Sequence, residues 1–117
     1  MAELTIERML EMQHQLQERY KSVWAPICPQ QGQNQLLYMI GETGEVIDII
    51  KKKGARQIME DPDIRHDFVE ELADVLMYFG DVMLCYGISA DELSRVYEKK
   101  FQRNMQRWDP RTGEQKH

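Results

Sequence analysis

Residues 36–54 read LLYMIGETGEVIDIIKKKG, and this stretch decides the fold class of the chain. Apolar residues recur at helical spacing from Leu36 to Ile50, and polar residues separate them. Three lysines and Gly54 follow. This order is typical of the end of a helix, because cations suit the last turn and glycine suits the cap. The stretch therefore predicts an amphipathic helix that ends at about Gly54.

Three further helices are predicted on either side of this one. An amphipathic period indicates the first, and Asp61-Pro62 offers a cap and a first helical position for the next. Gly87 is a C-cap, and the S-x-x-E spacing from Ser89 is a capping box for the last helix. These helices are expected over residues 4–24, from about 62 to 86 and from about 89 to 107, with a connector over 55–64.

The whole chain has the size of one compact domain, with 117 residues and a mass of 13.9 kDa. No segment alternates with a period of two, so no sheet is expected. We expect an all-α fold, a four-helix bundle over residues 1–108 that is completed by oligomerisation, with a polar C-terminal tail over 109–117.

Composition excludes several classes of function. A formal net charge of -5 argues against binding to a nucleic-acid polymer. No apolar run reaches the roughly 18 residues that a bilayer helix needs, so no membrane partner is expected. The first residues lack the pattern of a signal peptide, which predicts a cytoplasmic protein. Cys28 and Cys85 lack C-x-x-C spacing and are expected to be buried or inactive thiols.

Carboxylates lie where a simple bundle would place apolar side chains. At about 100° per residue, Glu42 falls inside the apolar arc of its helix, and Glu45 falls at the edge of that arc. On the next helix Glu71 lies between apolar positions, and Asp74 lies at the margin of the arc. Each of the two central helices therefore directs an i, i+3 acidic pair towards the core.

Such crowding of buried carboxylates is costly unless a cation compensates it. Mg²⁺ fits this role because it takes oxygen ligands and bridges to substrate phosphates, and Mn²⁺ is a substitute for it. No paired His or Cys lies near these positions, which disfavours Zn²⁺. The two acidic pairs together predict a magnesium site formed by Glu42, Glu45, Glu71 and Asp74.

The last helix carries cationic and amide side chains on its apolar side, where the two central helices carry carboxylates. Lys100, Asn104 and Arg107 have i, i+4, i+7 spacing and share a sector with the apolar face of the helix. Together they could hold phosphate oxygens. Alternatively, the two cations extend to the surface and pair with acidic residues.

The two acidic segments, IGETGEVID at 40–48 and EELADVL at 70–76, resemble those of the MazG-like all-α nucleoside triphosphate pyrophosphohydrolases. The signature of that family is E-x-x-E followed by E-x-x-D, as at Glu42/Glu45 and Glu71/Asp74. Residues 100–104 are similar to the K-x-x-x-N element of a later helix in that family. Asn34 matches an asparagine of the dCTPase-like branch, whereas residues 45–50 are closer to the MazG branch.

This resemblance implies Mg²⁺-dependent hydrolysis of a (deoxy)nucleoside triphosphate to the monophosphate and pyrophosphate, with a role in cleansing the nucleotide pool. It also implies that the four carboxylates bind the metal, that Asn34, Lys100 and Asn104 contact the substrate, and that a homodimer or homotetramer completes the site. A carboxylate that the metal does not saturate could take a proton from the attacking water, and Glu42 and Glu45 are the candidates. For Trp24, contact with the base and packing in the core are both open.

Three alternatives are weighed against this interpretation. A di-iron carboxylate bundle would use the E-x-x-H spacing of Glu11 and His14, but it needs that motif on two helices. A non-catalytic helical oligomer could bind a nucleotide or a protein partner without turnover. A phosphoribosyl-ATP pyrophosphohydrolase would carry out the same type of reaction on a different substrate.

Overall fold

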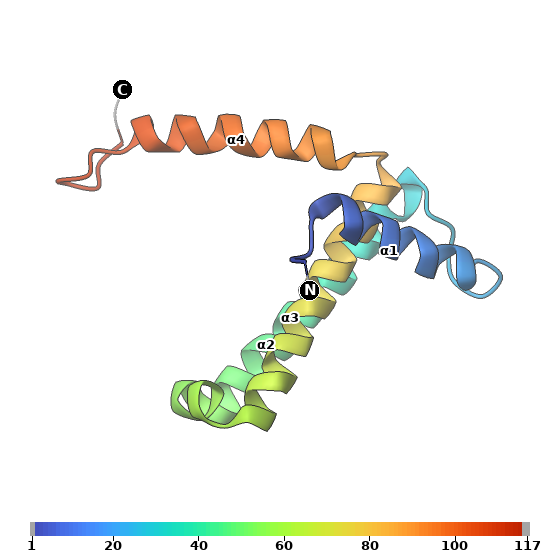
Figure 1. Cartoon of the computed structure of the whole chain (residues 1–117), viewed down its shortest axis with the longest axis horizontal. Coiled ribbons are helices and arrows are strands. Elements are labelled where there is room, and N and C mark those ends of the chain that lie inside the picture. The colour runs from blue at the N-terminus through green and yellow to red at the C-terminus, as the bar shows by residue number, and fades with distance from the viewer. Residues whose placement is uncertain (1, 116–117) are drawn as a thin grey trace.

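The computed structural model describes residues 2–115, and the elements of secondary structure in this range are all helical (Figure 1). The elements in chain order are α1 (Ile6–Arg19), a short 3₁₀ turn η1 (Pro29–Gln31), α2 (Gly32–Glu60), α3 (Pro62–Cys85) and α4 (Ala90–Arg107). Within the described range the structure contains an isolated β-bridge but no strand. The predicted all-α class with four helices is therefore confirmed.

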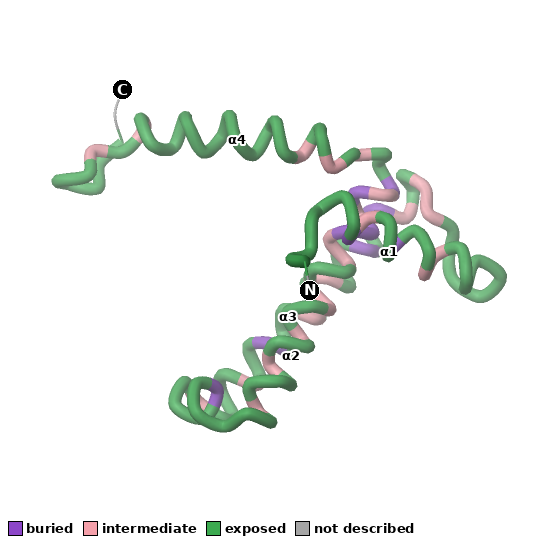
Figure 2. Tube along the Cα trace, viewed as in Figure 1, coloured by how far each residue is buried: buried purple, intermediate pink, exposed green. Residues whose placement is uncertain are grey.

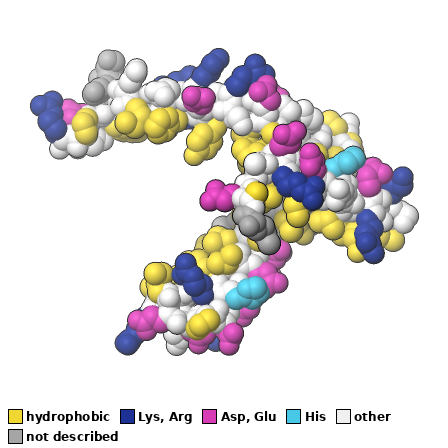
Figure 3. Space-filling model, in the orientation of Figure 1, with side chains coloured by type: hydrophobic (Ala, Val, Ile, Leu, Met, Phe, Trp, Pro, Cys, Tyr) yellow, Lys and Arg dark blue, Asp and Glu magenta, His cyan; other side chains and the backbone are white. Residues whose placement is uncertain are grey.

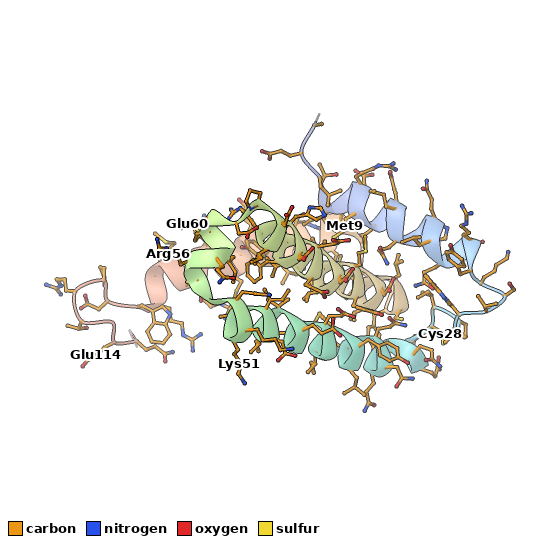
Figure 4. The ribbon with its side chains drawn as sticks, turned by 90° about the horizontal axis from the view of Figure 1, so that it is seen from below. Met9, Cys28, Lys51, Arg56, Glu60 and Glu114 are labelled. Atoms are coloured by element: carbon orange, nitrogen blue, oxygen red, sulfur yellow. The ribbon has the colours of Figure 1, made fainter. Side chains whose placement is uncertain are left out.

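The α2–α3 pair is the centre of the molecule. Figures 1 and 4 show the two helices side by side along their lengths, with Cys28 near the start of α2 and Glu60 at the turn into α3. Gly54 kinks α2, and the short helical segment 55–60 with Asp61 turns the chain, so α3 runs back along the part of α2 that precedes Gly54 (Figures 1 and 4). This arrangement places the middle of α2 against the middle of α3, where the two acidic pairs lie.

The predicted caps explain where several helices begin and end. The Asp61 side chain accepts hydrogen bonds from the backbone N–H groups of Asp63 and Ile64 at the start of α3. Ser89 accepts one from the N–H of Glu92 at the start of α4. Gly87 has φ +66°, the left-handed conformation that a residue after a helix commonly adopts.

Two helix boundaries differ from the prediction. α1 ends at Arg19, before residue 24, and α2 begins at Gly32, before Leu36. Regular helical geometry ends at Gly54, as predicted, with φ +82° and ψ +161°, and α2 consists of two helical segments joined by a kink at this residue. The predicted connector over 55–64 is wrong in that most of it is helical, because residues 55–60 are favourable helix formers and the Ile58 side chain among them is buried.

α1 lies across one end of the central pair, and α4 leads away from it. Most buried residues gather where α1 crosses α3 and the start of α2, as Figure 2 shows. α4 leaves the axis of α3 at 109°, and among the described helices it contacts α1 alone. No residue of α4 is buried. A single chain is therefore not a compact four-helix bundle, because its fourth helix lies outside the core.

The segment after α4 folds back on itself. Trp108 and Gln115 form the β-bridge, and the Asp109 N–H donates to the carbonyl of Glu114. Residues 116 and 117 of the predicted tail lie outside the described residues. No single described helix is long and apolar enough to cross a membrane, although the bent α3–α4 pair has the length and composition to do so.

Candidate active site

Three carboxylates meet between α2 and α3. One oxygen from each of Glu42, Glu45 and Glu71 lies within 4.8 Å of the others. Glu42 and Glu45 are one helical turn apart on α2, and Glu71 faces them from the antiparallel α3. The sequence prediction that these three side chains converge is consistent with this geometry.

Two oxygens in this group are enclosed and have no partner. The Oε2 atoms of Glu42 and Glu71 are buried, and neither has a hydrogen bond from the described part of the chain. A buried acceptor without a donor costs free energy. The group is therefore suited to receive a cation or proton donors.

The pKa of Glu71 reflects this crowding. Burial, the close approach of the Glu42 side chain and the negative charges of Glu45, Glu42 and Asp74 together raise the pKa of Glu71 to about 7. At neutral pH the metal-free group therefore holds about half a proton on average. A divalent cation would replace that proton.

The donor set fits Mg²⁺ or Mn²⁺. Three carboxylates supply hard oxygen ligands and leave other positions for water or phosphate. Asp74 was predicted as a fourth ligand, but it is not one of the three converging residues. It lies close enough to Glu71 to raise the pKa of that side chain, and it lines the adjacent cavity.

A cavity of about 480 Å³ adjoins the carboxylates and is bounded by α1, α2, α3 and the loop after α1. Glu42 and Asp74 belong to both the acidic region and the cavity wall. The aromatic part of the wall consists of Trp24, Tyr38 and Tyr78. Flat apolar rings beside acidic groups are suited to a ligand that has a planar ring at one end and a metal-binding anion at the other.

The aromatic side chains are arranged in two pairs. The rings of Tyr38 and Tyr78 are 5.7 Å apart and tilted by 49°, and Trp24 stacks on Tyr20 at 4.7 Å. Trp24 remains 44% exposed, so its packing in the core, one of the two interpretations of its role, is wrong. Its position in the wall leaves contact with a base as the prediction.

A buried polar cluster on the other side of the cavity was not found from the sequence. Gln13 and Gln17 of α1 both donate hydrogen bonds to Asp81 of α3, and Gln35 of α2 lines the same wall. Burial raises the pKa of Asp81, while the two amide donors act in the opposite direction. Gln13 follows Met9 at i+4 on the buried face of α1, a signal that could have indicated its burial.

The other predicted site residues lie away from the cavity. Asn34 is exposed and donates to the side-chain oxygen of Gln31, and it does not line the cavity. Lys100, Asn104 and Arg107 lie on α4, which extends away from α2 and α3 (Figure 1). One chain therefore does not bring these four residues to the carboxylates.

Glu11 and His14 give no support to the di-iron interpretation. Both are exposed on α1, and neither belongs to the group of converging carboxylates. Cys28 and Cys85 are free thiols, the first half-buried and the second buried, as expected.

Comparison with known proteins identifies the family. The family model for the MazG nucleotide pyrophosphohydrolase domain matches residues 30–108, a range that contains all three converging carboxylates and the whole of α4. Neither the curated proteins nor the solved structures include a match to this chain. Since the match covers most of the sequence, the chain belongs to the MazG nucleotide pyrophosphohydrolase domain family.

Proposed function

We propose that this protein hydrolyses a (deoxy)nucleoside triphosphate to the monophosphate and pyrophosphate, in a reaction that depends on Mg²⁺ and cleanses the nucleotide pool. The observation that carries the proposal is the convergence of Glu42, Glu45 and Glu71 beside a cavity with aromatic walls. Two of these carboxylates have enclosed oxygens without partners, which a metal ion would satisfy.

In this proposal Glu42, Glu45 and Glu71 hold the metal, and Asp74 contributes a further oxygen from the cavity wall. The metal, when bound, neutralises and orients the triphosphate. A carboxylate oxygen that is not used for binding takes a proton from the attacking water. Glu42 and Glu45 remain the two candidates for this general base.

The triphosphate also needs cationic side chains, and none of the described residues in the cavity wall is Lys or Arg. We assign this role to Lys100 and Arg107 of α4 from a second copy of the chain, with the neutral amide of Asn104 as a further hydrogen-bond donor. A homodimer or homotetramer would bring α4 of one copy over the carboxylates of another.

The surface of α4 supports this assembly. Tyr97 is 73% exposed and Met105 is 66% exposed, and Val96 and Phe101 are also uncovered. Figure 3 shows apolar side chains along the concave side of the molecule beneath α4. Exposed apolar residues also lie on the central pair, including Ile40, Ile47, Leu72 and Leu76. Apolar surface on this scale is typical of an interface between subunits.

The test is a panel of standard and modified nucleoside triphosphates with Mg²⁺, in which pyrophosphate and orthophosphate are both measured. The wild type should release pyrophosphate first. Glu71→Gln should lower turnover by roughly 100-fold or more, because a neutral amide binds a divalent cation poorly. Glu70→Gln is the matched control, since Glu70 is the exposed neighbour that pairs with His66.

The outcomes separate the alternatives. Orthophosphate as the first product would contradict the proposed reaction. If phosphoribosyl-ATP is tested as well and is the only compound turned over, the chain is a phosphoribosyl-ATP pyrophosphohydrolase. No turnover of any compound would favour a non-catalytic binding protein.

A further inference from the structure

The buried polar cluster in the cavity has features that the proposed reaction does not use. Asp81 is 5% exposed, Gln13 is 4% exposed and Gln35 is 8% exposed, yet all three line the cavity. Buried polar side chains are costly unless their hydrogen bonds are made. The hydrogen bonds that are missing therefore indicate what a ligand must supply.

Asp81 is held by one of its two oxygens. The side-chain amide of Gln13 donates to Oδ1 at 2.8 Å, and that of Gln17 donates to the same oxygen at 3.1 Å. Within residues 2–115 the side-chain hydrogen bonds to the Asp81 carboxylate both end on Oδ1, and none ends on Oδ2. The two amides fix the orientation of the carboxylate and leave one oxygen as a free acceptor in the cavity wall.

Gln35 provides an independent sign of a missing donor. Its Oε1 is buried and has no hydrogen-bond partner among the described residues. It belongs to α2, whereas Asp81 belongs to α3, so two helices present unused acceptors to one cavity. A ligand that carries N–H groups would satisfy both of them.

Close packing of α1 on α3 positions the cluster. A Cβ atom on Gly80 would lie 3.1 Å from Cγ of Gln13, which is tighter than an ordinary contact. The absence of a side chain at Gly80 therefore lets α1 approach until Gln13 reaches Asp81.

We propose that Asp81 selects nucleobases with an exocyclic amino group, by accepting a hydrogen bond from that group on the oxygen that Gln13 and Gln17 leave free. This inference rests on the proposed function, because it places the base in the cavity and the phosphates at the metal that Glu42, Glu45 and Glu71 would hold. The rings of Tyr38, Tyr78 and Trp24 would pack against the base.

The amino group distinguishes cytosine from uracil, and adenine from hypoxanthine. A keto oxygen in the same position would face a carboxylate with no proton between them, so both acceptors would remain unsatisfied. Loss of a hydrogen bond to a charged group in a buried site corresponds to about 10- to 100-fold in kcat/KM.

Asp81→Asn changes the chemistry with little change in shape. Gln13 and Gln17 are both donors here, so the oxygen of the new amide should face them and its NH₂ group should face the cavity. That group would donate to a keto oxygen. The variant should therefore lose the preference for amino bases or prefer keto bases.

The experiment compares kcat/KM for dCTP with dUTP and for dATP with dITP, in the presence of Mg²⁺. We expect the wild type to favour the amino member of each pair by at least tenfold, and Asp81→Asn to reduce each ratio by at least tenfold. Asp67→Asn is the control, because Asp67 is an exposed residue of α3 outside the cavity wall. It should keep the wild-type ratios.

A second measurement needs neither metal nor turnover. In NMR titrations with EDTA, deoxycytidine should bind the wild type at least tenfold more tightly than deoxyuridine. Equal affinities or equal rates would overturn the inference, even if both triphosphates release pyrophosphate as the proposed function requires. Selective nucleoside binding without any turnover would support the inference and contradict the proposed function. If Asp81→Asn fails to fold, the wild-type comparisons decide.

Discussion

Binding of Mg²⁺ should displace a proton from the carboxylates between α2 and α3. The pKa of Glu71 is about 7 without metal, because burial and the neighbouring Glu42, Glu45 and Asp74 favour its neutral form. Metal ligation requires the ionised carboxylate, so the metal and the proton compete.

The size of the effect follows from that pKa. Binding should release about 0.9 proton per metal at pH 6, about 0.5 at pH 7 and about 0.1 at pH 8. The apparent Kd for Mg²⁺ should be about tenfold weaker at pH 6 than at pH 8. The three carboxylates titrate together, so the proton belongs to the group rather than to one residue.

Isothermal titration calorimetry in buffers of different ionisation enthalpy measures this proton release directly. Glu71→Gln should abolish the pH dependence and weaken binding at every pH, whereas Glu70→Gln should behave as the wild type. An apparent Kd that is constant from pH 6 to pH 8, with no proton released at pH 6, would refute the reasoning about crowded carboxylates.

Three further predictions concern stability and assembly. Without metal, the temperature of the unfolding midpoint should decrease as the pH is raised from 5 to 8. The raised pKa of Glu71 adds stability that is fully present below the ordinary pKa of a glutamate and is lost as the pH rises through about 7. A steeper decrease in Glu71→Gln than in the wild type would contradict this. Phe101→Glu should shift the protein to monomers and lower turnover at least tenfold, as measured by analytical ultracentrifugation and product release, whereas an unchanged oligomer would argue against the role of α4. Gly54→Ala should lower the free energy of unfolding by about 1–3 kcal/mol in urea titrations, because φ +82° and ψ +161° suit only glycine. Lys53→Ala, at the exposed neighbour of Gly54, is the control and should change the free energy of unfolding by less than about 0.5 kcal/mol.

Local chemistry made much of the fold predictable. Asp61 and Ser89 form the expected caps because a cap depends on side chains within a few residues of it. Regular helical geometry ends at Gly54, as its position after three lysines predicts. The helical conformation of the residues that follow was not predictable from the glycine, because burial of Ile58 and the helix-forming residues around it stabilise a second segment.

The candidate site was predictable in part for the same reason. The periodicity of α2 and α3 placed Glu42, Glu45 and Glu71 on facing sides, and the short connection from Gly54 to Asp61 made the helices antiparallel. The separation of Lys100 and Asn104 from the carboxylates follows from the angle between α3 and α4. That angle is a tertiary property that helical spacing does not contain.

The polar side of the cavity depends on contacts between distant parts of the sequence. Gln13 and Asp81 are 68 positions apart and meet only because α1 packs across α3 at Gly80. In the sequence each is an ordinary polar residue of a helix. Their burial and shared hydrogen bond became visible only in the three-dimensional arrangement.

The central claim is that carboxylates from α2 and α3 form one metal site, and a crystal structure of the protein soaked with Mn²⁺ tests it most directly. The account predicts an anomalous-scattering peak bonded to oxygens of Glu42, Glu45 and Glu71, which disappears in Glu71→Gln and persists in Glu70→Gln. A peak elsewhere, or no peak between these helices at a Mn²⁺ concentration that supports turnover, would contradict it.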